Sequence, residues 1–143
     1  MEDFVTYEQA LALKNLGFSE ECFYHYYIVT KELKSNVVVE ENALLSDFLM
    51  DFNYDDEYNC YISAPTLVQT QKWLRKEKGL YLIWDMGQDR KHDSKFAWYV
   101  CDRHGYIVDT LASEIKYDSP EEALSEGITE CLNFLELEND KEK

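Results

Sequence analysis

Three β-prone runs follow one another between residues 80 and 111, and this feature limits the possible fold more than any other. The runs are Leu80–Trp84, Phe96–Cys101 and Tyr106–Leu111, each rich in the aromatic and branched residues typical of strands. Four residues that end in Gly105 join the last two runs. This connection has hairpin length and places glycine where a positive φ is needed. The segment therefore predicts an antiparallel β-meander.

Two amphipathic helices are predicted on either side of this meander. The first covers about residues 65–77, begins near Pro65, and stops at Gly79. The second begins at a capping box formed by Ser119 and Glu122. Its apolar face consists of Leu124, Ile128, Cys131, Leu132 and Leu135.

The first third of the chain begins with another short helix, predicted over residues 7–16. Thr6 and Gln9 have the spacing of a capping box, and Gly17 can adopt the left-handed conformation that ends a helix. Beyond it, we expect Cys22–Val29 to pair with Asn36–Val39 as a hairpin across residues 30–35. A further helix is indicated after Asn42 by an apolar stripe at helical spacing, made of Leu45, Phe48, Leu49 and Phe52.

These elements indicate an α+β fold in which one antiparallel sheet is packed on one face by helices, as a two-layer single domain. A chain of 143 residues with 15% aromatic residues can build its own core. With two prolines and five glycines there is no obvious linker, so we expect one domain over residues 1–143. Residues 138–143 are expected to form a short acidic tail.

Acidic residues dominate the charge, with 29 Asp and Glu against 14 Lys and Arg and a formal net charge of −15. Residues 1–63 carry 13 acidic and 3 basic groups, which gives −10. Residues 64–113 carry 6 and 8, or +2, and residues 114–143 carry 10 and 3, or −7. This field repels phosphate backbones and attracts basic proteins, so direct nucleic-acid binding is not expected. The alternative is that the charge only keeps the chain soluble.

The sequence also bears on location. It contains no run of about 18–20 apolar residues, and its first residues, Met1-Glu2-Asp3, are acidic where a secretory signal would be positive. The four cysteines have no metal-ligand spacing, and we expect reduced, buried thiols, with two disulfides as the alternative in an oxidising compartment. A cytoplasmic protein without membrane contact is the expectation.

The common catalytic signatures are missing, so we expect no catalytic residue, metal or cofactor. Asp51-Phe-Asn53-Tyr-Asp55 opens like an EF-hand loop. The rest of the loop does not match the EF-hand motif. Asp56 occupies the position where glycine is needed, and Ile62 occupies the position where a bidentate Glu should complete the calcium coordination. A solvated acidic loop is the favoured interpretation.

The first half of the chain is unusually rich in tyrosine, a residue enriched in binding hot spots. Tyr24 and Tyr26 should share one face of a strand, opposite His25 and Tyr27, and only one face can meet the core. The alternative is ordinary sheet packing. The candidate contact residues for a protein partner are Tyr24, Tyr26, Asp51, Tyr54, Asp55, Asp56, Glu57 and Tyr58.

Three stretches carry a resemblance: residues 4–18, Ala64-Pro-Thr66 with Lys72-Trp-Leu-Arg75 and Gly79, and residues 117–127. Together they resemble a group of small uncharacterised proteins encoded by bacteriophages and prophages of gut bacteria. The segment from about Cys22 to Cys60 departs from that pattern, since it is longer and more acidic. The resemblance implies a cytoplasmic protein made during infection or carried by an integrated element, and it transfers no catalytic residue.

The primary hypothesis is a non-catalytic accessory protein of phage type that binds a protein with a basic surface. An alternative is a ligand-binding or enzymatic domain with a site on the open sheet face near Trp84, Trp98 and His104. A homodimer formed through the exposed sheet face or a strand edge is a third hypothesis.

Overall fold

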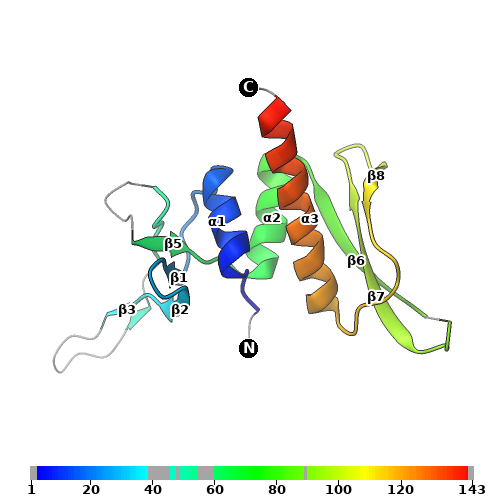
Figure 1. The fold of residues 1–143 in the computed structure, drawn as a ribbon, viewed down its shortest axis with the longest axis horizontal. Helices are drawn as coiled ribbons and strands as arrows, with labels where there is room; N and C mark the ends of the chain where they lie inside the picture. The colour runs from blue at the N-terminus through cyan, green and yellow to red at the C-terminus, as the bar shows by residue number, and fades with distance from the viewer. Residues whose placement is uncertain (1–2, 39–45, 48, 55–59, 89, 142–143) are drawn as a thin grey trace. The chain divides into compact units, whose positions relative to one another are not determined.

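The structure is a computed structural model that describes residues 3–38, 46–47, 49–54, 60–88 and 90–141. The α+β class is confirmed, but the strands of the described residues form three antiparallel sheets where one was expected (Figure 1). The chain divides into two compact units, Glu2–Thr66 and Leu67–Lys143. The single domain over residues 1–143 stays a prediction.

The N-terminal unit combines one helix with two small sheets. Its three-stranded sheet has the order β2-β1-β5, and β3 pairs with β4. The elements are α1 (Tyr7–Asn15), β1 (Tyr24–Tyr27), β2 (Glu32–Ser35), β3 (Val37–Val38), β4 (Ser46–Asp47) and β5 (Tyr61–Ser63).

Helix α1 begins and ends as its sequence predicts. The Gln9 backbone N–H donates to Thr6 Oγ1 at 3.1 Å, and the Thr6 N–H donates to Gln9 Oε1 at 2.8 Å, which completes the capping box. Gly17 has φ +93°, the left-handed conformation that lets the chain leave the helix. The helix contacts β5 and buries Ala10 and Leu13 completely.

The predicted partner of β1 was wrong. Strand β1 pairs with β2, with Tyr24 opposite Ser35 and Tyr27 opposite Glu32, so only four residues form the connection. Lys31 closes it with φ 58° and an N–H that donates to the Tyr27 carbonyl oxygen at 2.7 Å. Val37 and Val38, which were expected to pair with β1, pair with β4 instead, and Val39 lies outside the described residues.

The helix expected after Asn42 was also wrong in its described part. Residues 46 and 47 form β4, and Met50 makes a bridge with Cys22. Asn42, Leu45 and Phe48 lie outside the described residues. Phe52 is buried, as expected of a core residue, whereas Leu49 is half-exposed.

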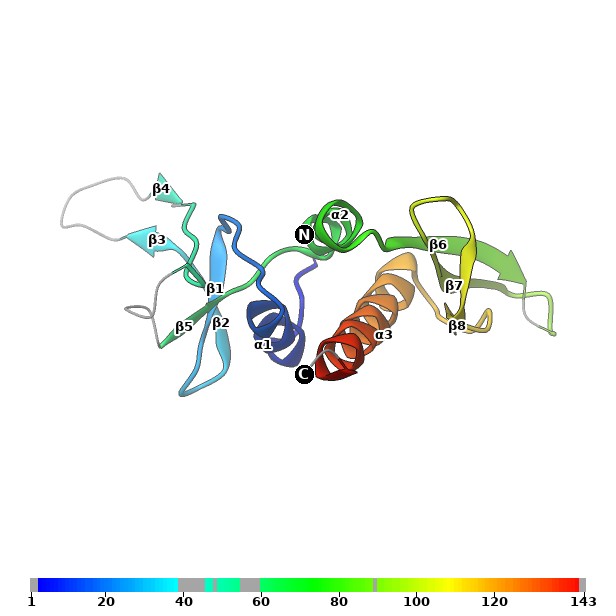
Figure 2. The same ribbon diagram turned by 90° about the horizontal axis from the view of Figure 1, so that it is seen from above.

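The C-terminal unit contains the predicted meander. Its antiparallel sheet has the order β6-β7-β8, and α3 contacts all three strands (Figures 1 and 2). Helix α2 contacts both α3 and β6. The elements are α2 (Leu67–Lys78), β6 (Tyr81–Gln88), β7 (Ser94–Cys101), β8 (Ile107–Ala112) and α3 (Pro120–Lys141).

Helix α3 approaches the sheet most closely at Gly127. A Cβ atom there would lie 2.6 Å from Leu82 Cδ1 and 3.1 Å from Trp98 Cγ. Leu82 and Trp98 are both buried, with Val100 beside them on the same sheet face. Glycine thus lets the helix backbone lie directly on the core.

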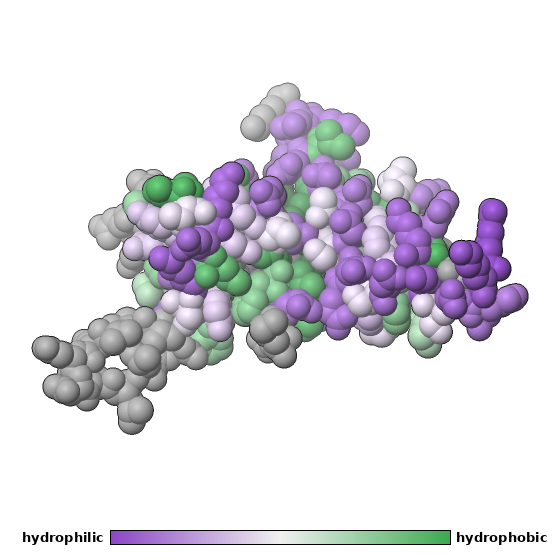
Figure 3. All heavy atoms as spheres, turned by 60° about the horizontal axis from the view of Figure 1, so that its bottom comes forward, coloured by the Kyte–Doolittle hydropathy of each residue, from purple (hydrophilic) through white to green (hydrophobic). Residues whose placement is uncertain are grey.

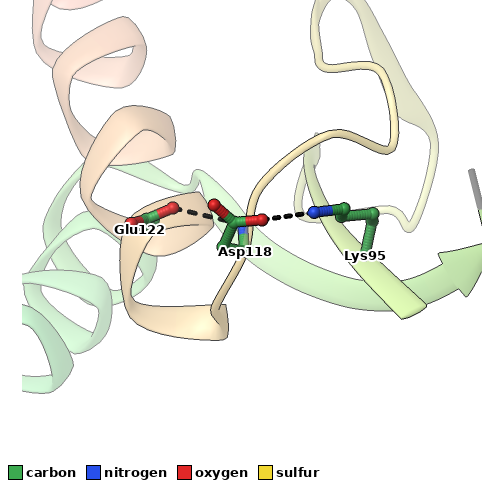
Figure 4. Close-up of polar contacts among 3 residues, drawn as sticks. All are labelled: Lys95, Asp118 and Glu122. Atoms are coloured by element: carbon green, nitrogen blue, oxygen red, sulfur yellow. Dashed lines mark hydrogen bonds and ion pairs between the residues drawn. The ribbon is translucent and has the colours of Figure 1, made fainter. Parts of the chain in front are cut away.

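Both ends of α3 differ slightly from the expectation. Ser119 Oγ accepts from the Glu122 N–H at 3.1 Å, as in a capping box, but the Glu122 carboxylate accepts from the Asp118 N–H instead of that of Ser119. Asp118 also pairs with Lys95 at the start of β7, as Figure 4 shows. The helix continues to Lys141, so residues 138–141 are helical and not a loose tail.

Candidate protein-binding surface

The tyrosines of β1 do not follow the simple alternation of buried and exposed side chains that is expected of a strand. Tyr26 is only 8% exposed, and its hydroxyl donates to the Val5 carbonyl oxygen at 2.5 Å. Burial, with a smaller contribution from Glu8, raises the pKa of Tyr26, so the hydroxyl remains a neutral donor. Tyr24 is half-buried, with its ring 4.4 Å from the ring of Phe4.

Side chains of the same unit also contact the other side of β1. His25 is buried, and its Nδ1 lies 2.5 Å from Asn36 Oδ1. Its ring centroid is 4.9 Å from that of Phe52 and 4.9 Å from that of Tyr61. Both sides of this strand therefore contact the chain itself, which leaves Tyr26 little area for a partner.

The segment around Asp51 is held by hydrogen bonds to distant parts of the unit. The Asp51 carboxylate accepts from the Ser19 hydroxyl and from the Asn53 N–H, the latter at 3.0 Å. The Asn53 side chain donates to the Phe18 carbonyl oxygen at 3.1 Å and accepts from the Ser63 N–H at 3.2 Å. Asp51 and Asn53 thus fix the loop by side-chain bonds, which is a structural role for residues that resembled calcium ligands.

Three large side chains of this unit are exposed near that loop. Cys22 and Met50 exchange two backbone hydrogen bonds of 2.9 and 3.0 Å. Antiparallel pairing places Phe23 and Leu49 one residue beyond this bridge, where they are 48% and 49% exposed. Tyr54 is 81% exposed. We call Phe23, Leu49 and Tyr54 the exposed apolar group.

Sequence reasoning found Tyr54 but missed Phe23 and Leu49. Phe23 was assigned to a continuous strand, and Leu49 to the apolar stripe of a helix. Neighbouring acidic residues were a usable signal of exposure for both side chains. Glu21 lies two residues before Phe23, and Asp51 lies two residues after Leu49. Asp55, Asp56, Glu57 and Tyr58 lie outside the described residues, and the binding role of the predicted set stays a prediction.

The N-terminal unit that holds this group is strongly negative. Residues 1–66 contain 13 acidic and 3 basic side chains, a balance of −10. Glu8, Glu21 and Glu32 are exposed, and the ion pair between Lys34 and Glu32, 3.8 Å apart, is itself exposed. Such a pair is screened by solvent, so the unit keeps its negative potential.

The alternative site on the C-terminal sheet is not assembled as expected. Trp84 and Trp98 share a sheet face, but Trp98 is buried at 4% exposure, close to Gly127 of α3, while Trp84 is 43% exposed. Among the described residues, Trp98 Nε1 is the buried side-chain polar atom without a hydrogen-bond partner. His104 lies in the exposed turn after β7, where its backbone N–H donates to Asp102.

The other titratable groups with altered pKa values have structural causes. Backbone N–H groups of Tyr106 and His104 donate to the Asp102 carboxylate and lower its pKa. Burial raises the pKa of Cys131 to about 12. All four cysteines are free, as expected, and Cys22 and Cys131 are buried, but Cys101 is only half-buried and Cys60 is exposed, so the expectation of buried thiols was wrong for Cys60 and holds only in part for Cys101.

Comparison with known proteins adds no relative: no family model, curated protein or solved structure matches the chain. Within its described part, no helix combines the length and apolar character needed to cross a bilayer. No group of three or more His, Cys, Asp or Glu side chains that could hold a metal ion occurs among the described residues.

Proposed function

We propose that this chain is a non-catalytic, cytoplasmic accessory protein of phage or prophage type that binds a protein with a basic surface through its N-terminal unit. One observation carries the proposal: the exposed apolar group lies on the unit that holds −10 of the net charge of −15. Exposed apolar side chains on a unit with net charge of one sign suit a contact in which electrostatics selects the partner and burial stabilises the complex.

The two parts of this surface have different roles in binding. Negative potential increases the rate of encounter with a basic surface, and this effect falls as salt screens the charges. Phe23, Leu49 and Tyr54 supply contact area, which mainly slows dissociation. Truncation of a residue that is central to such a contact costs about 1–2 kcal/mol, or roughly a 5- to 30-fold increase in Kd.

Affinity capture with matched variants tests the proposal. The purified chain is immobilised and exposed to a lysate of the cell that expresses it, at about 0.05 M and about 0.5 M salt. We expect a basic protein to be retained at low salt and released at high salt, and to be lost from a variant that carries Phe23→Ser, Leu49→Ser and Tyr54→Ser.

The control variant has Val68→Ser, Tyr106→Ser and Leu137→Ser, three exposed positions of the C-terminal unit. It should retain the same protein. Equal capture by both variants, or retention that does not depend on salt, contradicts the proposal. Capture only of the chain itself would identify a homodimer instead.

A further inference from the structure

Beyond Leu82, where α2 reaches it, the outer edge of β6 is open to another strand. β6 is an edge strand of the β6-β7-β8 sheet, and no other strand of the described residues pairs with its outer side. Of its eight residues, Ile83 to Met86 are all exposed. An exposed edge with apolar residues is a template for strand addition.

Backbone hydrogen bonds identify which groups face outward. In an antiparallel ladder, alternate residues direct both their N–H and C=O away from the partner strand. Gln71 of α2 donates to the Leu82 carbonyl oxygen at 2.7 Å, and the Met86 N–H donates to Asp85 Oδ1 at 2.8 Å. Leu82 and Met86 therefore face outward, and so does Trp84 between them.

The side chains at this edge favour an apolar neighbour on one sheet face. Trp84 and Met86, 43% and 61% exposed, lie on the same face, and Phe96 on β7 packs against Trp84 with ring centroids 5.9 Å apart. An added strand would place every second side chain beside Trp84 and Met86. It would thus need apolar residues at alternate positions.

Positive charge lies at both ends of the edge. Arg75 is exposed one turn after Gln71 on α2, and the Arg103 guanidinium lies 3.1 Å from the Cβ position of Gly79, just before β6. At the other end, Arg90 is exposed in the turn to β7, and Figure 3 shows this hairpin end, at the right, as hydrophilic.

The positive balance of charge in the C-terminal unit is confined to α2 and the sheet. Residues 67–116 carry 9 basic and 7 acidic side chains, a balance of +2, whereas residues 117–143, which include α3, carry 2 basic and 9 acidic side chains, a balance of −7. Lys95 is paired with Asp118 (Figure 4), so it is not one of the charges left for a ligand. The exposed arginines at the two ends, Arg75, Arg90 and Arg103, therefore suit an acidic ligand at this edge.

We propose that the outer edge of β6 binds an extended acidic peptide of another protein by strand addition, with apolar residues at alternate positions against Trp84 and Met86. This is a second binding surface, on a different unit from the one proposed above. Asp85 regulates access to it, because its carboxylate occupies the Met86 N–H and repels acidic ligands.

The probe is a yeast-displayed library of random peptides of about ten residues, the upper length of an ordinary strand. The full-length chain should enrich peptides of net negative charge with alternating apolar residues. A synthetic copy of an enriched peptide should lose binding when alternate amides of one set are N-methylated, and keep it when the other set is methylated.

Variants of the edge complete the test. Met86→Pro removes an outward N–H without breaking the ladder to β7, and it should weaken binding by about tenfold or more, beyond the effect of Met86→Ala. Asp85→Ala should strengthen binding. The proposal is overturned if enriched peptides are basic, if none is enriched, or if Met86→Pro binds like Met86→Ala. It is also overturned if light scattering finds a dimer that Met86→Pro dissociates, because a second copy then occupies the edge.

Discussion

The close approach of α3 to its sheet makes Gly127→Ala an informative perturbation. The added Cβ would lie 2.6 Å from Leu82 Cδ1 and 3.1 and 3.2 Å from two ring atoms of Trp98. Carbon atoms pack best about 3.5–4.0 Å apart, so all three contacts are too short. Leu82 can move its terminal methyl group, whereas the ring atoms of Trp98 lie close to the backbone and cannot move independently.

Two opposing contributions decide whether Gly127→Ala raises or lowers the free energy of unfolding. Overpacking of a filled core costs about 1–3 kcal/mol. Replacing glycine by alanine within a helix contributes about 1 kcal/mol of stability. We therefore expect Gly127→Ala to lower the free energy of unfolding by about 1 kcal/mol, although alanine is the better helix former.

Urea unfolding followed by tryptophan fluorescence measures this difference. Trp73, Trp84 and Trp98 all lie in the C-terminal unit, so the signal reports on the unit that contains Gly127. With an m-value of about 2 kcal/mol/M, the midpoint should fall by about 0.5 M. Asn133→Ala, at an exposed position of α3, is the control and should raise it slightly. A Gly127→Ala midpoint equal to or above that of the wild type would refute the packing argument.

Three further results are expected. Thr6→Ala should destabilise α1 by about 1 kcal/mol through loss of its cap, seen as faster amide hydrogen exchange in that helix, and unchanged exchange would contradict this. Gly79→Ala should cost about 1–2 kcal/mol in the same fluorescence assay, because φ is +67° there, and a neutral result would mean that the turn relaxes. At pH 8 a thiol reagent should modify Cys60 quickly and Cys131 only after unfolding. Since the pKa of the Cys131 thiol is 9.0 when unfolded and about 12 when folded, its contribution to the free energy of unfolding should fall between pH 9 and 12, and Cys131→Ala should make this slope shallower.

Local signals predicted those elements whose ends are marked by the chain itself. The capping box of Thr6 and Gln9 and the left-handed Gly17 mark α1, and Gly79 and Gly105 mark the stop of α2 and the turn before β8. Each signal depends on neighbours within four residues, so tertiary contacts had little to override.

The segment between residues 28 and 52 was mispredicted for the opposite reason. The apolar spacing that suggested a helix is short, and such a pattern does not decide between helix and strand. The bridge between Cys22 and Met50 joins residues 28 positions apart, and the turn at Lys31 needs a positive φ that lysine rarely adopts. Neither feature can be read from nearby residues.

The candidate site was predicted in part. Alternation along β1 indicated that one face needed a cover, but the Tyr26 hydroxyl reaches the Val5 carbonyl oxygen, a contact across 21 residues. Phe23 and Leu49 become neighbours only through the same bridge at Cys22. The outer edge of β6 also depends on strand order, which the meander alone does not reveal.

The most direct test of the central claim, that the exposed apolar group contacts a basic protein, is site-specific photo-crosslinking. A benzophenone amino acid is placed at Tyr54 in one sample and at Tyr106 in another, two tyrosines that are 81% and 73% exposed on different units. We predict a crosslink to a basic protein from position 54 that weakens as salt rises, with none from position 106. Equal crosslinking from both positions, or none from position 54, would contradict the claim.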